Sequence, residues 1–279
     1  MNIDMKFLIK KIFFLAVISL SMLYADIYQS GNLLPIEQAI EEAQDDTLVI
    51  FDVVDTLITC DEPLFHSNNK NTFGKVSETF FHNLSKEKVD ELMTTILNER
   101  KTSLVDAKVL ELLEVIRKKH FKMLVLTSCG TGKYGIIEKM EDWRLHQLRS
   151  VGFNFEDLSI KDEKWFDSMQ GPHGVPLLKN GVIFSAQIDK SIVLEEVFKV
   201  ENLSFKKIIY VDDQLQNLKD VQAFCEKKGL DFIGFEYTAV KDRPVQKIDE
   251  KLIEIQLNIL LNEGQWITSE EAAETFNDD

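Results

Sequence analysis

Polar side chains that can do chemistry follow directly after three short apolar runs of this sequence. Two of the runs are followed by acidic residues, namely Asp52 and the pair Asp212 and Asp213, and the third is followed by two hydroxyl residues, Thr127 and Ser128. A carboxylate can attack an ester as a nucleophile, or it can bind a hard divalent cation such as Mg²⁺, which prefers oxygen ligands. These residues are therefore the first candidates for a functional site.

The apolar runs predict the elements that position these side chains. They are rich in β-branched, aliphatic and aromatic residues and span 48–51, 123–126 and 208–211. Short runs without alternating polar residues are typical of strands that are buried on both faces of a parallel sheet. Open α/β sheets bind their ligands at the carboxyl edge of such strands. We therefore expect Asp52 to stand at the working edge of a sheet, although a carboxylate that only caps a strand end has the same local pattern.

Amphipathic segments between the predicted strands complete an α/β pattern. Helices are expected over residues 35–43, 85–97, 106–119, 143–151, 190–198, 218–228 and 248–263. Because strand–helix–strand units of this kind are right-handed and parallel, we expect a Rossmann-like parallel sheet flanked by helices. A single domain over residues 26–279 is expected, with its core in about 36–57, 105–129 and 181–262, and with a small helical or irregular cap in about 58–104 and 130–180.

The first 25 residues have the composition of a secretory signal peptide. Lys6, Lys10 and Lys11 precede an apolar run that ends at Ala25, a small residue suited to cleavage. The apolar run is short for a bilayer span, which argues against the alternative of an uncleaved anchor. We therefore expect an exported protein, periplasmic or secreted, with no stable membrane span after cleavage.

Composition excludes some classes of partner. The net charge of −15 argues against a general nucleic-acid surface and against an anionic membrane surface. With three cysteines, Cys60, Cys129 and Cys225, at least one thiol has no partner within the chain. Cys60 and Cys129 each lie a few residues after a predicted strand that ends at the candidate site. They either form a disulfide there or act as small apolar residues.

A lysine adds a fourth element to the acidic and hydroxyl groups. Lys190 begins a predicted helix about twenty residues before Asp212. In their order and positions, Asp52, Thr127, Lys190 and Asp212 resemble the motifs of the haloacid dehalogenase superfamily, whose phosphotransferases use an aspartate nucleophile. More loosely, the chain resembles the secreted acid-phosphatase-like branches of that superfamily. The resemblance extends over residues 48–221.

The resemblance implies a role for each candidate residue. Asp52 would be the nucleophile and a Mg²⁺ ligand, and Asp212, Asp213 and the backbone carbonyl of Val54 would supply further ligands to the metal. Thr127 and Ser128 would bind the phosphoryl oxygens, and Lys190 would neutralise the charge that Asp52 and the phosphate share. The implied activity is hydrolysis of a phosphoester, carried by a small molecule or a protein, through an aspartyl-phosphate.

Val54 departs from the family pattern. The phosphatases of this superfamily have an acid–base aspartate at that position, and such proton transfer typically contributes about 10²–10⁴ in rate. Asp55 is expected to be a turn residue, although a shift of one residue would let it replace the aspartate. Three readings stay open: a slow or specialised phosphatase, a binding protein without turnover, and carbon–halogen or carbon–phosphorus chemistry. Carbon–halogen chemistry is disfavoured, because the dehalogenases of the superfamily have a cap arginine soon after the nucleophile, whereas the first arginine of this chain is Arg100.

Overall fold

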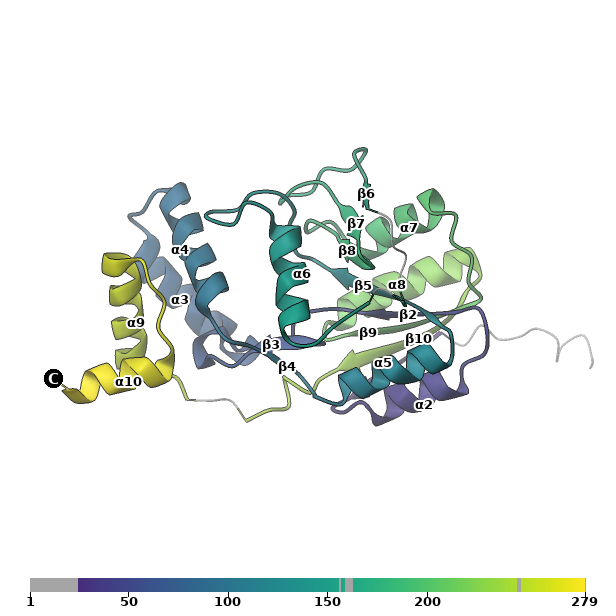
Figure 1. Cartoon of the computed structure of the whole chain (residues 1–279), viewed down its shortest axis with the longest axis horizontal. Coiled ribbons are helices and arrows are strands. Elements are labelled where there is room, and N and C mark those ends of the chain that lie inside the picture. Colours follow the sequence, from purple (N-terminus) through teal and green to yellow (C-terminus); the bar gives the residue numbers. More distant parts are fainter. Residues whose placement is uncertain (1–24, 156, 159–162, 245–246, 279) are drawn as a thin grey trace, which may run out of the picture.

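The computed structural model describes residues 25–155, 157–158, 163–244 and 247–278. Within these residues the chain has the predicted α/β fold, in which helices flank a mainly parallel central sheet (Figure 1). The predicted signal peptide lies outside the described residues, apart from residue 25. None of the helices in the described ranges is both long and apolar enough to cross a membrane.

Eight strands of the described chain form one sheet. In spatial order they are β1 (Ala25–Ser30), β10 (Asp231–Tyr237), β9 (Lys207–Asp212), β2 (Thr47–Phe51), β5 (Lys122–Thr127), β8 (Val182–Phe184), β7 (Leu177–Lys179) and β6 (Lys164–Trp165). The first six strands of this order are parallel to one another. The strand β7 pairs antiparallel with β8, and β6 pairs antiparallel with β7. The sequence does not predict β1, which extends the sheet beyond β10.

Both faces of the sheet are covered, as the apolar strands require. In β2, Val49 and Phe51 belong to one hydrophobic cluster, while Leu48 and Ile50 belong to another. The first cluster includes residues of α2 (Leu34–Glu42), α5 (Val109–Lys118) and α6 (Met140–Ser150). The second includes residues of α7 (Lys190–Val200) and α8 (Leu215–Lys228). This alternation of buried side chains holds β2 rigidly in the middle of the domain.

The first segment of the predicted cap, residues 58–104, begins and ends in a small antiparallel ribbon. The second segment, residues 130–180, differs from the prediction, because it supplies α6 to the core and β6 and β7 to the main sheet. The strands of the ribbon are β3 (Ile58–Cys60) and β4 (Thr102–Leu104), and between them lie η1 (Pro63–Phe65), η2 (Ser67–Asn69), α3 (Lys70–Phe81) and α4 (Lys86–Glu99). As predicted, Ser85 caps α4, since its hydroxyl accepts a hydrogen bond of 3.3 Å from the amide of Lys88. The ribbon thus carries a helical module out from the sheet.

The C-terminal helices differ from the prediction, which assigned residues up to 262 to the sheet core. Ile253, Leu257 and Leu260 of α9 (Glu250–Glu263) pack instead with Leu92 and Ile96 of α4. The short helix α10 (Ser269–Asp278) follows α9, and both lie beside α3 and α4 at the left of Figure 1. An apolar stripe predicts that a helix face is buried but not which neighbour buries it.

The loop after β5 ties the cap to the core. The amide of Ile136 donates a hydrogen bond of 3.0 Å to the hydroxyl of Thr94 in α4. Next to it, Gly135 has a φ of +52° and lies so close to α4 that a Cβ atom would approach Thr94 Oγ1 to 2.2 Å. The close contact between this loop and α4 therefore depends on glycine at position 135.

We expect Gly135→Ala to destabilise the fold more than the matched control Gly132→Ala. Both positions have positive φ, which costs alanine about 1–2 kcal/mol, but nothing lies within 4 Å of a Cβ at position 132. The clash with α4 adds roughly 1–3 kcal/mol at position 135. Urea denaturation at equilibrium measures both free energies of unfolding, and equal losses would contradict the close approach.

Candidate active site

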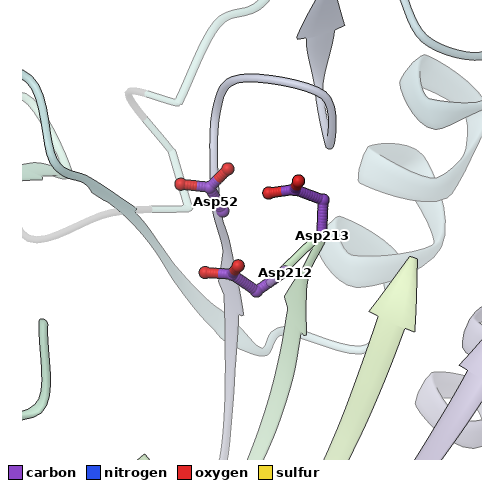
Figure 2. A group of neighbouring side chains, drawn as sticks. All are labelled: Asp52, Asp212 and Asp213. Carbon is purple, nitrogen blue, oxygen red and sulfur yellow. The ribbon is translucent and has the colours of Figure 1, made fainter. Parts of the chain in front are cut away.

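Three carboxylates meet at the carboxyl edge of the sheet. Asp52 follows β2, Asp212 is the last residue of β9, and Asp213 comes next. Phe51 pairs with Val211 in these neighbouring strands, and the amide of Asp52 donates to the Val211 carbonyl over 2.9 Å. The three side chains are buried, and one oxygen of each lies within 4.8 Å of the others (Figure 2). Strand pairing therefore brings together acidic groups that are far apart in the sequence.

Lys190 completes the predicted group. It is the first residue of α7, where the Asp189 side chain caps the helix by accepting from the amide of Ser191. Its side chain is 3% exposed, and its Nζ donates to Asp52 and, over 2.7 Å, to Asp212. A lysine at a helix N-terminus is disfavoured by the helix dipole, so the two carboxylates supply the attraction that holds it there.

The charges in this group shift its ionisation. Burial raises the pKa of Asp52 to about 7, and the charge of Asp212 contributes to the rise. Burial and the charge of Asp212 likewise raise the pKa of Asp213 to about 6. Burial alone would lower the pKa of Lys190, but the carboxylates reverse this and raise it. When ionised, the three carboxylates face two ammonium groups, the buried Lys190 and the more exposed Lys241, which leaves an excess of negative charge away from water.

The side chain of Asp212 is fixed by several donors. Its carboxylate accepts hydrogen bonds from the hydroxyl of Tyr210, from the amide of Gln214 over 2.7 Å and from the side chain of Asn217 over 3.0 Å. Tyr210 is not among the predicted site residues. Its position in the sequence could have predicted its role, because Tyr210 lies two residues before Asp212 and alternate residues of a strand point to the same face.

A second lysine was also not predicted. Lys241 donates to the backbone carbonyl of Asp213, and its Nζ lies 3.8 Å from the Asp213 carboxylate and 3.7 Å from that of Glu236. It lies in the loop after β10, without any motif around it. Only the folded arrangement of β9 and β10 brings Lys241 to Asp213.

The turn after β2 holds the two residues that depart from the family pattern. Asp55 has a φ of +63°, and its carboxylate accepts a hydrogen bond of 2.9 Å from Thr59. This agrees with its prediction as a turn residue. Val54, whose carbonyl is a predicted metal ligand, lies in the same turn, and 42% of its surface is exposed. An apolar side chain therefore faces outward where a proton-transferring group was expected.

The predicted hydroxyl residues lie at the same edge, at the end of β5 next to β2. The buried Thr127 accepts a hydrogen bond of 3.2 Å from the amide of Cys129. Ser128 lines a cavity of about 570 Å³, which His173 and Arg144 also line. Within the described residues, no hydrogen bond joins Thr127 or Ser128 to the three carboxylates.

The described cysteines are not paired with one another. Cys60, Cys129 and Cys225 are all free thiols, so the alternative of a Cys60–Cys129 disulfide is not realised in this structure. Burial raises the pKa of the Cys129 thiol. A neutral, half-buried thiol is a weak nucleophile, which agrees with a packing role.

Without divalent cations, we expect the protein to lose stability as the pH rises from about 5 to about 8. The unfolded carboxyls ionise near pH 4, whereas Asp52 and Asp213 keep protons to about pH 7 and 6, so the folded state binds more protons in this window. The loss from Asp52 over this window is roughly 3 kcal/mol.

Urea denaturation in the presence of a chelator measures this loss. The control is Asp52→Asn, which removes one titrating group and should therefore show a smaller loss between the same two pH values. A loss as large as that of the unaltered protein would show that Asp52 does not carry the effect.

Comparisons with known proteins place the chain in a family. The family model described as "Protein of unknown function (DUF2608)" matches residues 29–273. The "Uncharacterized protein RP296" of Rickettsia prowazekii is 23% identical over 248 residues, which are 89% of this chain and 89% of that protein. A "Putative outer membrane protein" of Chlamydia pneumoniae is 24% identical over 217 residues, 75% of this chain and 76% of that protein.

A shorter match reaches another "Putative outer membrane protein", from Chlamydia trachomatis, which is 27% identical over 104 residues, 37% of each chain. No solved structure matches the chain significantly. The family model covers most of the sequence, including each residue of the acidic group and Lys190. The chain is thus a member of the DUF2608 family.

Proposed function

We propose that this protein is an exported, metal-dependent phosphoester hydrolase that acts through an aspartyl-phosphate on Asp52. The observation that carries the proposal is the position of Lys190, which bridges Asp52 and Asp212 beside Asp213 at the carboxyl edge of a parallel sheet. A nucleophilic carboxylate and a phosphate repel each other, so the reaction needs positive charge of this kind. The arrangement is what a relationship to the haloacid dehalogenase superfamily would require.

The donor set fits Mg²⁺. Asp52 Oδ2 and Asp213 Oδ1 accept no hydrogen bond from the described residues, whereas Asp212 receives donors on both oxygens. Asp52 and Asp213 are therefore the carboxylates best placed to hold the ion, and Asp212 orients Lys190. The excess negative charge in a buried group also favours a bound cation.

The residues of the chain would divide the reaction into two steps. An oxygen of Asp52 bonds to phosphorus while the bond from phosphorus to the leaving oxygen breaks, and water then hydrolyses the aspartyl-phosphate to release inorganic phosphate. Lys190 neutralises charge throughout. Thr127 accepts from a backbone amide, so its hydroxyl hydrogen is left to donate to a phosphoryl oxygen. Mg²⁺ would supply further positive charge between nucleophile and phosphate.

The exposed Val54 favours a second candidate, a binding protein that keeps the metal site without turnover. Valine cannot protonate the leaving oxygen, so the leaving group must depart as an anion and take its proton from water. This selects esters of acidic alcohols, such as aryl phosphates, if the protein is an enzyme. It removes turnover altogether if the natural ligand is a poorer leaving group.

Two observations support export. The first residues combine three lysines, an apolar run and Ala25, which is typical of a signal peptide. The Chlamydia relatives carry the name "Putative outer membrane protein". We infer a location outside the cytoplasmic membrane, in the periplasm or beyond it.

Hydrolysis of p-nitrophenyl phosphate tests the proposed function. We expect turnover that depends on added Mg²⁺, and we expect Asp52→Asn to lower kcat by about 10³-fold or more, because it removes the nucleophile. Asp45→Asn is the matched control, since it removes an exposed carboxylate on the same connection to β2 and should leave kcat unchanged.

Absence of turnover would have two distinct meanings. If Mg²⁺ raises the melting temperature and Asp213→Asn abolishes that rise, the protein binds the ion and is the binding protein of the second candidate. If Mg²⁺ changes neither hydrolysis nor the melting temperature, both candidates are wrong.

Val54→Asp is expected to raise the hydrolysis of alkyl phosphates by about 10²–10⁴, because it adds a proton donor next to the leaving oxygen. Val54→Asn serves as the control, because asparagine has nearly the shape of aspartate but cannot transfer a proton to the leaving oxygen. The ratio of kcat for the two variants is the measurement. A ratio near one would show that the missing proton donor does not limit the reaction.

A further inference from the structure

Two arginines from different parts of the chain line one cavity beside the carboxylates. Arg100 directly follows α4 of the cap, and Arg144 lies on α6. Both line a cavity of about 110 Å³ together with Val54 and Asp55. The cavity therefore starts at the turn that follows the proposed nucleophile. Its size suits one small charged group.

Arg144 connects this cavity to the larger one. It also lines the cavity of about 570 Å³, at whose edge lie Ser128 and Gly130. A substrate whose phosphate lies at the strand ends thus has the two arginines within reach of its other end. This places them on the side of the leaving group, where Val54 also lies.

Neither guanidinium forms an ion pair with a carboxylate of the described residues. Arg144 is 6% exposed, and its Nε has no hydrogen-bond partner, while its other contacts are the neutral side chains of Gln147 and Cys129. The Nε of Arg100 is likewise buried without a partner. In the described ranges of the chain, no carboxylate oxygen lies within 4.0 Å of either guanidinium.

Aromatic rings hold both groups in place. The guanidinium carbon of Arg100 lies 5.6 Å from the centre of the Phe65 ring, and that of Arg144 lies 4.8 Å from the centre of the Trp143 ring. Such stacking orients a planar guanidinium without neutralising it. The two side chains are therefore ordered before any ligand arrives, which lowers the entropic cost of binding one.

The positive charge of Arg100 and Arg144 is not balanced by an ion pair with a described residue. Arg144 is close enough to Arg100 for its positive charge to lower the pKa of Arg100, in addition to the effect of burial. Asp55 lines the same cavity, and its negative charge offsets part of this effect on the pKa of Arg100, but its carboxylate accepts its hydrogen bond from Thr59 and forms an ion pair with neither arginine. Arg144 is buried and Arg100 is half-buried, and cations withdrawn from water in this way destabilise a fold unless an anion pairs with them. Guanidinium groups match carboxylates and phosphates in bidentate geometry.

We propose that Arg100 and Arg144 form a subsite for a second anionic group, a carboxylate or a phosphate, carried by the leaving group of the substrate. The proposal rests on the proposed function, because it identifies the class of ester that Asp52 attacks. It also accounts for Val54. An aspartate there would place a carboxylate in the cavity of the two arginines and compete with the substrate anion.

Matched pairs of substrates test the subsite. Phenyl phosphate is compared with 4-carboxyphenyl phosphate in one pair and with 1,4-phenylene bisphosphate in the other, so that the two pairs distinguish a carboxylate from a phosphate on a similar aryl leaving group. We expect kcat/KM to be about 10- to 100-fold higher for the more anionic member of at least one pair. Equal values within both pairs would overturn the proposal, whatever the variants do.

Variants then assign the preference to the arginines. Arg144→Gln and Arg100→Gln are each expected to reduce the ratio of kcat/KM within the preferred pair by about tenfold or more. Arg149→Gln removes an exposed arginine from the same helix as Arg144 and should keep the ratio. A ratio that survives both cavity variants, with circular dichroism showing that they are folded, would contradict the assignment.

A binding measurement separates this proposal from the proposed function. Calorimetry compares benzylphosphonate with 4-carboxybenzylphosphonate and phenylphosphonate with 1,4-phenylenebisphosphonate, none of which needs turnover. If no ester is hydrolysed but the more anionic ligand of either pair binds at least tenfold more tightly, and Arg144→Gln removes the difference, the subsite is real and the hydrolase is wrong. If esters are hydrolysed without any preference, the hydrolase is supported and the subsite is wrong.

Discussion

The excess of negative charge at the end of β2 and β9 is the constraint on which the site depends. Three buried carboxylates face Lys190 and the more exposed Lys241. The hydrogen bonds that Asp212 accepts from Tyr210, Asn217 and a backbone amide spread only part of the remaining charge. Burial of such a group is unfavourable in isolation, so the fold has to recover that free energy elsewhere. It does so through a sheet that is covered on both faces, whose central strands leave the carboxylates little freedom to move apart.

The two arginines are the opposite case. Arg100 and Arg144 line the cavity at the turn that follows β2, and neither forms an ion pair with a described residue, whereas Lys190 and Lys241 balance only part of the charge of the three carboxylates. A ligand that carries a cation at one end of the site and an anion at the other would satisfy both groups. A Mg²⁺-bound phosphoester with an anionic leaving group has this distribution of charge, so the proposed reaction and the proposed subsite describe one ligand.

The cap contributes Arg100 to the proposed subsite. Arg100 comes from the end of α4, and the hydrogen bond from Ile136 to Thr94 fixes α4 against the loop after β5. The C-terminal helix α9 buries the outer face of the same module. The position of Arg100 relative to Arg144 is therefore set by packing between the cap and the core, and it would change if the cap moved.

The sequence by itself determined the α/β class and placed Asp52, Asp212 and Asp213 at strand ends, because a buried parallel strand has an uninterrupted apolar run and the polar residue that follows marks its end. Lys190 was predicted instead as the first residue of a helix and from the resemblance to a known superfamily. It also marked Asp55 as a turn residue. Only the tertiary structure decided the partners of α9, the edge strand β1, and the approach of Tyr210, Lys241 and the two arginines. These depend on contacts between distant segments, and local periodicity records that a face is buried without recording what buries it.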